Sequence, residues 1–243
     1  MSLVTTVEQA SGVGNGAATT ATRVGTFGAG GAEPYARALR RDDRELYLHG
    51  AGRAGNDSGA SAMNLSRWND HADPTDLSLI AASTGAMLDV GCGPGRMVRA
   101  AMRFGLVALG IDVSPTAIEI AREGGLTVLE RSVFDRLPRE GAWATVLLVD
   151  GNIGIGGDAS HLLERCGQLI APTGTIIVET DADPERDDSY HGTLIDMWGH
   201  ASESFPWAEI GRNAVARRAA LVGLRVDQTW VASGRAFSRL GRA

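Results

Sequence analysis

The chain has 243 residues, 44% of them hydrophobic, with 23 basic and 29 acidic side chains. This length and apolar content suit one globular domain with an appendage or two small domains, and the net charge of −6 argues against nucleic acid or an anionic membrane as the main partner. The sequence contains no Lys, which excludes Schiff bases, pyridoxal phosphate chemistry and a phosphate-loop lysine.

The chain shows no sign of export or of a metal site. Its N-terminal residues lack the basic start and apolar run of a secretory signal, and its longest apolar runs are only strand-sized. Cys92 and Cys166 are too few for a disulfide framework or a cysteine-based metal site, and the separation of His191 and His200 does not match metal-ligand spacing. We therefore expect a soluble cytoplasmic protein that binds no metal.

The N-terminal quarter of the chain differs from the rest in amino-acid composition and in hydrophobic periodicity. Residues 1–31 are rich in Gly, Ala, Thr and Ser and have no helical or strand period, so we expect a disordered tail. Residues 32–64 are expected to form an irregular extension, with a small helix or hairpin between Tyr35 and Leu48 and a Gly/Ser/Asn-rich loop after it. Residues 65–243 are expected to form the main domain.

Strands and helices alternate along this domain. In chain order we expect a helix starting at Asp73-Pro74, a strand over 86–90, a helix over 96–104, a strand over 106–112, a helix capped by Ser114-Pro115, strands over 126–130 and 144–150, a helix over 161–170, a strand over 174–180, a helix over 209–222 and an antiparallel pair over 224–231 and 235–240. The alternation predicts right-handed crossovers and a doubly wound α/β fold, a parallel sheet with both faces covered.

A glycine-rich turn joins the first strand of this domain to its helix. Residues 88–96 read LDVGCGPGR. Because glycine has no Cβ, a ligand can lie against the main chain of this turn, where it faces the N–H groups at the start of the following helix. Asp112 ends the next strand, 21 positions after Gly91, where an acidic residue can accept hydrogen bonds from ribose hydroxyls. Together these features predict a nucleoside-bearing cofactor. The G-x-G-x-G spacing and Pro94 argue against a nicotinamide cofactor.

These motifs resemble those of the class I S-adenosylmethionine-dependent methyltransferases. The resemblance covers about residues 65–240. It rests on the first motif at 88–95, the second at 110–114, the fourth strand at 143–150 and the corner from helix to fifth strand at 162–174. It implies a Rossmann-like, mostly parallel seven-stranded sheet whose last strand is antiparallel, and it implies S-adenosylmethionine as the cofactor.

The resemblance also implies roles for individual residues. Asp89 and the glycines would hold the amino-acid part of the cofactor, and Asp112 would hold the ribose. Ser132 stands where many members have an acidic residue that contacts the adenine, and Val133 can offer its N–H to the ring. The predicted cofactor-binding residues are Asp89, Gly91, Cys92, Gly93, Gly95, Asp112, Val113, Ser132, Val133 and Asp150.

The segment after the fourth strand, residues 150–158, contains four glycines and differs from the Pro-Pro-aromatic motif of members that methylate amide or ring amines. It resembles the corresponding string of a set of actinobacterial methyltransferase-like proteins. We expect it to line the pocket rather than to be a flexible connector. Trp198, Phe205 and Trp207 are expected either to line an apolar pocket or to cover a sheet edge, and the acidic run 181–188 to be a solvated loop.

The predicted function is that of an S-adenosylmethionine-dependent methyltransferase acting on a small molecule. Methyl transfer from a sulfonium mainly requires alignment of donor and acceptor, and a base is needed only if the acceptor must lose a proton early. The candidate bases are Asp150, His191 and His200, whereas Cys92 is expected to pack rather than to react. The alternative is a non-catalytic scaffold or regulatory protein that binds the same cofactor.

Overall fold

The structure is a computed structural model that describes residues 25–28, 34–41, 45–51, 60–63 and 65–243. Most of the predicted tail and parts of the predicted extension, namely residues 1–24, 29–33, 42–44, 52–59 and 64, lie outside the described residues. Within the described residues, no helix is both long enough and apolar enough to cross a membrane.

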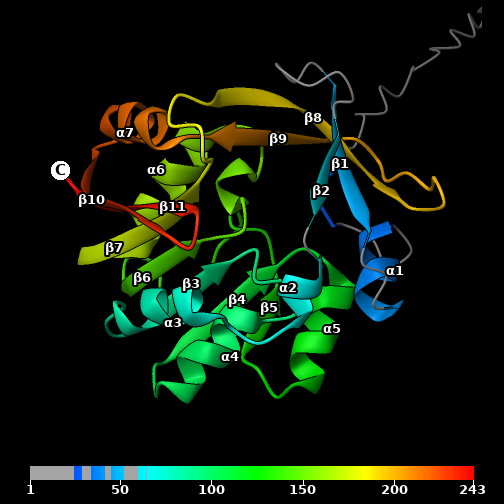
Figure 1. Cartoon of the computed structure of the whole chain (residues 1–243). Coiled ribbons are helices and arrows are strands. Elements are labelled where there is room, and N and C mark those ends of the chain that lie inside the picture. Colours follow the sequence, from blue (N-terminus) through cyan, green and yellow to red (C-terminus); the bar gives the residue numbers. More distant parts are fainter. Residues whose placement is uncertain (1–24, 29–33, 42–44, 52–59, 64) are drawn as a thin grey trace, which may run out of the picture.

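The main sheet has seven strands in the order β10-β11-β7-β6-β3-β4-β5 (Figure 1). Their bounds are β3 (Met87–Val90), β4 (Ala108–Asp112), β5 (Val128–Glu130), β6 (Trp143–Leu148), β7 (Ile170–Thr180), β10 (Leu224–Ala232) and β11 (Arg235–Arg242). The five strands from β3 to β7 run parallel, and β11 is antiparallel to both β7 and β10. The predicted seven-stranded, mostly parallel sheet with an antiparallel last strand is confirmed.

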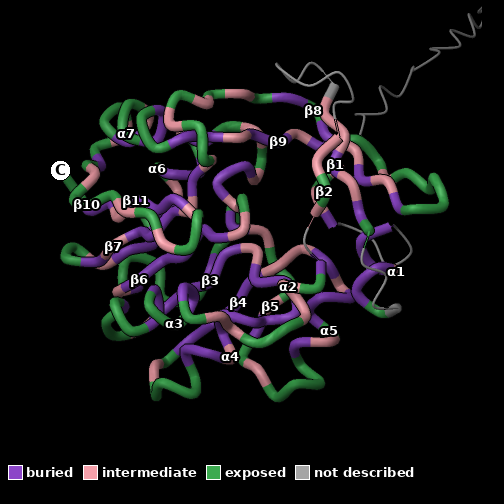
Figure 2. The backbone as a smooth tube through the Cα atoms, in the orientation of Figure 1, coloured by how far each residue is buried: buried purple, intermediate pink, exposed green. Residues whose placement is uncertain are grey.

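Helices cover both faces of this sheet (Figure 1), whose central strands are largely buried (Figure 2). Each face has its own buried hydrophobic cluster. The helices are α3 (Pro74–Ala81), α4 (Arg96–Arg103), α5 (Pro115–Glu123), α6 (Ala159–Leu169) and α7 (Arg212–Leu221). Buried apolar side chains of α3 and α4, with Ile118 and Ala121 of α5, belong to one cluster and those of α6 and α7 to the other. The predicted doubly wound arrangement is therefore confirmed, because apolar faces on both sides of parallel strands need cover.

A second, antiparallel sheet of four strands in the order β2-β1-β8-β9 lies beside the main sheet (Figure 1). It consists of β1 (Leu46–Ala51), β2 (Ala60–Met63), β8 (Asp187–Asp196) and β9 (Phe205–Ile210), with the short helices α1 (Pro34–Arg41) and α2 (Leu65–Asn69) next to it in the chain. The region expected to hold a helix or hairpin thus contains a helix followed by the first strand of a hairpin. The described part of the extension is more regular than predicted.

Two local predictions near this second sheet are wrong. The acidic run 181–188 is a loop only up to Arg186. Asp187 and Asp188 begin β8, whose Tyr190 and Leu194 are buried in one cluster with residues of the extension. The helix predicted over 209–222 begins at Arg212, since Glu209 lies in β9 and pairs with Asp188. The first error arises because β8 pairs with β1, which is distant in sequence, and the second because β9 pairs with the preceding strand β8.

Local capping signals position the helices that frame the carboxyl edge of the main sheet. Asp73 caps α3 in a capping box with Asp76, and Ser114 caps α5 by accepting a hydrogen bond from the N–H of Ala117. Both helix starts had been expected from Asp73-Pro74 and Ser114-Pro115.

We predict that Ser114→Ala lowers the free energy of unfolding by about 1 kcal/mol, the usual cost of losing a capping side chain. Urea unfolding followed by circular dichroism measures the difference. Ser204→Ala serves as the control, because Ser204 is exposed. Equal stability of the two variants would contradict the capping role.

Candidate functional site

A cavity of about 250 Å³ lies at the carboxyl ends of β3, β4, β5 and β6. Each of these strands contributes the residues that directly follow it, and the remaining wall comes from the N-terminal segments and β9. The chain leaves β3 for β4 and β5 on one side and later returns to place β6 and β7 on the other side. Such a reversal of strand order opens a crevice at the carboxyl edge, which is where parallel α/β folds bind ligands.

Eight of the ten predicted cofactor-binding residues line this cavity. They are Gly91, Cys92, Gly93, Asp112, Val113, Ser132, Val133 and Asp150. Of the other two, Asp89 is buried in β3, and Gly95 caps α4 with a φ of 89°. A Cβ at Gly95 would lie 2.4 Å from Cδ1 of Leu126, so this glycine is required by the packing of the turn.

Asp112 and Gly93 are joined at the cavity wall. The carboxylate of Asp112 accepts hydrogen bonds from the N–H of Gly93 at 2.9 Å and from the N–H of Ser114 at 2.8 Å. Burial raises the pKa of Asp112, and these backbone donors oppose the shift. Gly93 has a φ of 54°. Apart from its chain neighbours, the one described atom within 4 Å of a Cβ added there is the hydroxyl oxygen of Tyr35, at 3.4 Å. A side chain there would therefore project into the cavity.

Asp89 carries an unusual buried carboxyl group behind the glycine loop. Its side chain is 1% exposed, and neither carboxylate oxygen has a hydrogen-bond partner in the described part of the chain. Burial raises the pKa of Asp89 to about 7, with Arg96 opposing the shift and Asp150, Asp112 and Asp76 adding to it. The interior therefore favours the protonated form of this carboxyl group.

Asp150 follows β6 in a left-handed conformation with a φ of 56°. Its carboxylate lies 2.5 Å from Nη2 of Arg96 and 3.2 Å from Nε of Arg67, and its N–H donates to Glu179 at 2.7 Å. Burial raises the pKa of Asp150, whereas the neighbouring guanidinium groups lower it. The structure thus places this candidate base at the cavity as an ion-paired residue, not as a lone carboxylate.

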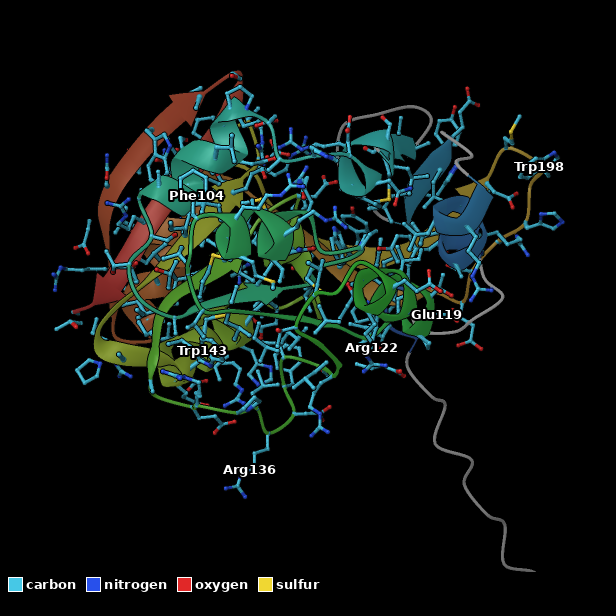
Figure 3. The ribbon with its side chains drawn as sticks, turned by 90° about the horizontal axis from the view of Figure 1, so that it is seen from below. Phe104, Glu119, Arg122, Arg136, Trp143 and Trp198 are labelled. Atoms are coloured by element: carbon cyan, nitrogen blue, oxygen red, sulfur yellow. The ribbon has the colours of Figure 1, made fainter. Side chains whose placement is uncertain are left out.

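The two histidines proposed as bases do not line the cavity. His191 is exposed on β8, and Nδ1 of His200 lies 2.9 Å from Asp196 in the loop after β8. Trp207 lines the cavity, whereas Trp198 is 52% exposed and points away from the body of the molecule (Figure 3). Of the candidate bases, the structure therefore brings only Asp150 to the cavity.

Sequence reasoning missed an aromatic wall on the side of the N-terminal segments. The ring centroid of Phe27 lies 5.2 Å from the ring centroids of Tyr35 and Trp207. These three side chains line the cavity together with Trp68. Phe27 belongs to the described part of the predicted tail, residues 25–28. No periodicity marks an isolated aromatic residue in a Gly-rich segment, so only its tertiary contacts reveal it.

The segment 150–158 contacts the glycine loop and, as predicted, lines the cavity. The side-chain amide of Asn152 donates to the carbonyl groups of Val90 and Gly91 at 2.8 and 3.0 Å. Asn152, Ile155 and Gly156 also line the cavity. Arg96 was overlooked, although its position directly after the glycine motif, at the start of a helix that faces the site, was a usable signal.

The pKa of Asp89 generates a prediction about stability. A carboxyl group protonated in the folded state and ionised in the unfolded state contributes stability that is lost as the pH rises from about 4 through the folded pKa of about 7. One such group lowers the free energy of unfolding by at most about 1.4 kcal/mol per pH unit. We expect Asp89→Asn to flatten this decline in urea unfolding series between pH 5 and 7, whereas Asp70→Asn, at an exposed aspartate, should leave it unchanged. Parallel curves for the wild type and Asp89→Asn would contradict the assignment.

Comparison with known proteins agrees with this geometry. Residues 87–174 match the methyltransferase domain family. A ubiquinone biosynthesis O-methyltransferase from Methylococcus capsulatus is 32% identical over 121 residues, which cover 44% of this chain and 50% of the relative. Another from a Chelativorans species is 29% identical over 99 residues, which cover 39% of each chain. The matched part thus spans half or less of these curated relatives.

The fold has a counterpart among solved structures. A methyltransferase from Bacteroides fragilis, crystallised with S-adenosyl-L-homocysteine, matches 86% of this chain and 92% of its own, with a TM-score of 0.70 and 19% identity. This likeness concerns the fold alone, while the sequence match covers β3 to β6 and the residues after them that line the cavity. Residues 87–174 therefore resemble a methyltransferase domain in sequence, and the chain has the Rossmann-like fold of the Bacteroides fragilis methyltransferase.

Proposed function

We propose that this chain is an S-adenosylmethionine-dependent methyltransferase that acts on a small molecule. The observation that carries the proposal is the pairing of Asp112 with the N–H of Gly93 at a cavity on the carboxyl edge of the sheet. Curated relatives of the same domain are O-methyltransferases of ubiquinone biosynthesis, which supports a small-molecule acceptor. The net charge of −6 also favours a small molecule over a nucleic acid.

The residues at the cavity fit an S-adenosylmethionine molecule. The space at Gly93 that a Cβ would fill allows a ligand to lie against the backbone, and Asp112 offers a fixed carboxylate to ribose hydroxyls. Ser132 and Val133 follow β5 and line the cavity, and we expect them to border the adenine. The orphaned carboxyl group of Asp89 and the guanidinium of Arg96 lie behind and beside the glycine loop, where the amino-acid part would bind.

S-Adenosylmethionine supplies an electrophilic methyl group on a sulfonium that is its own leaving group. The chain then has to hold the acceptor in line with this methyl group and to exclude water from the cavity. Phe27, Tyr35, Trp68 and Trp207 form an apolar wall suited to the second task. The ion pairs of Asp150 fix the segment after β6 for the first task.

A cofactor-binding scaffold without turnover is the competing proposal. It is favoured by one observation: the histidine candidates lie away from the cavity, and Asp150 is ion-paired. Purified protein incubated with methyl-labelled S-adenosylmethionine and a cell extract separates the two. Transfer of label into extracted small molecules, with release of S-adenosylhomocysteine, supports the enzyme; tight cofactor binding without transfer supports the scaffold.

We predict that the protein binds S-adenosylmethionine and S-adenosylhomocysteine but not NAD. The G-x-G-x-G turn lacks the third glycine spacing of the nicotinamide fingerprint, and Pro94 lacks an N–H for a pyrophosphate. Isothermal titration calorimetry with the three ligands tests this specificity. Binding of NAD without any response to S-adenosylmethionine would refute it.

Two substitutions at the cavity should weaken cofactor binding for different reasons. Asp112→Ala removes a charged acceptor, which typically costs about 1.5–3 kcal/mol, or roughly one to two decades in affinity. Gly93→Val puts a branched side chain into the space of the ligand at a φ of 54° and should abolish binding, with some loss of stability. Calorimetry measures affinity and thermal unfolding measures stability, with Asp70→Ala as the control. An affinity of Asp112→Ala within twofold of the wild type would show that the ribose assignment is wrong.

A further inference from the structure

A second cavity, of about 340 Å³, adjoins the first. The two cavities share the side chains of Met63, Trp68, Asp150 and Trp207. The second lies at the carboxyl ends of β6 and β7 and is bordered by β1, β2 and β9 of the four-stranded sheet. A molecule bound there would meet the contents of the first cavity at Asp150, so the second cavity is suited to the methyl acceptor.

The wall of the second cavity carries more negative than positive groups. Among the described residues of this wall, four carboxylates, those of Asp150, Glu179, Asp181 and Glu209, face two guanidinium groups, those of Arg67 and Arg235. The excess of two negative charges lies in a partly enclosed space, where charges interact more strongly than in bulk water. An anionic acceptor would therefore be repelled, and a cationic one attracted.

The two guanidinium groups are already engaged by carboxylates. Nitrogen atoms of Arg235 lie 2.6 Å from Glu179 and 2.8 Å from Asp76. Those of Arg67 lie 2.7 Å from Asp76, 3.1 Å from Asp73 and 3.2 Å from Asp150. Asp73 and Asp76 are not part of the cavity wall, so the positive charge of the wall is partly used by carboxylates outside it.

The opposite side of the cavity keeps a negative character. Asp181 and Glu209 lie 4.0 and 3.9 Å from Arg186, whose shorter contact, at 2.8 Å, is with Asp188. The carboxylate of Glu209 also accepts a hydrogen bond from the hydroxyl of Tyr190. Arg186 thus lies within 4.0 Å of three carboxylates, and two of these border the cavity.

Apolar and aromatic groups complete the wall. Leu48, Ile153 and Ile210 offer surface to a hydrocarbon skeleton, and the indole rings of Trp68 and Trp207 stand where the cavities join. Aromatic faces attract cations in addition to the carboxylates. We propose that the second cavity binds the methyl acceptor and that this acceptor is a small molecule carrying a protonated amine, recognised by Asp181 and Glu209. This inference rests on the proposed function.

A matched series of simple ligands tests the charge selectivity of the cavity. Butylammonium, butanol and butyrate, at equal ionic strength, are titrated into the full-length protein saturated with S-adenosylhomocysteine. Indole N–H resonances of Trp68 and Trp207, assigned with single Trp→Phe variants, report binding by nuclear magnetic resonance. Butylammonium should shift both resonances with a Kd at least about tenfold lower than those of butanol and butyrate. Glu209→Gln should weaken butylammonium binding about tenfold, in keeping with the loss of a charged partner.

Glu164→Gln is the control, since Glu164 is exposed on α6 away from both cavities and should leave the titration unchanged. Equal affinity of the three ligands, tighter binding of butyrate, the absence of any shift with butylammonium, or full affinity in Glu209→Gln would each overturn the proposal. Calorimetry with S-adenosylhomocysteine is a separate measurement. If it shows no binding, the proposed methyltransferase function fails, and the titration without this ligand still tests the cavity.

Discussion

The buried carboxylate of Asp76 requires cationic partners, and the arrangement around both cavities depends on how it obtains them. Its side chain is fully buried, with nitrogen atoms of Arg67, Arg235 and Arg96 at 2.7, 2.8 and 3.4 Å. These residues belong to α2, β11 and α4, so one charge joins the short helix before α3, the antiparallel strand β11 and the helix after the glycine loop. Removing one partner of a buried ion pair typically costs about 3–5 kcal/mol, which shows how firmly such contacts fix these elements.

The same guanidinium groups extend the network to the wall between the cavities. Arg96 and Arg67 form ion pairs with the carboxylate of Asp150, and the carboxylate of Glu179 accepts a hydrogen bond from the N–H of Asp150. A positive φ at a residue other than glycine costs of order 1–3 kcal/mol and persists only where the surroundings impose it. Here the ion pairs and the hydrogen bond impose it, and Asp150 becomes a fixed border between the two cavities. For a reaction that depends on alignment of donor and acceptor, a rigid border of this kind has functional value.

The composition of the chain suits this network. Apart from histidine, every basic residue of the chain is Arg, because the sequence contains no Lys. A guanidinium presents several donors in one plane, so that Arg235 contacts Glu179 with two nitrogen atoms and Asp76 with another. An ammonium group is a compact point charge and lacks this fork geometry. A network in which three cations serve four carboxylates therefore depends on arginine in particular.

The amino-acid sequence by itself determined the main sheet, its helices and the glycine loop beside Asp112. Short-range sequence patterns predict these features: apolar runs, capping residues and glycine spacing. The glycine loop and Asp112 are then expected to lie close together, because parallel strands end at the same edge of the sheet. Only the tertiary structure decided the four-stranded sheet, in which Leu46 pairs with Asp196, the place of Phe27 in the aromatic wall, and the exclusion of His191 and His200 from the cavity. Each depends on contacts between residues far apart in the chain, and the energy of such contacts depends on burial and geometry that no local pattern records.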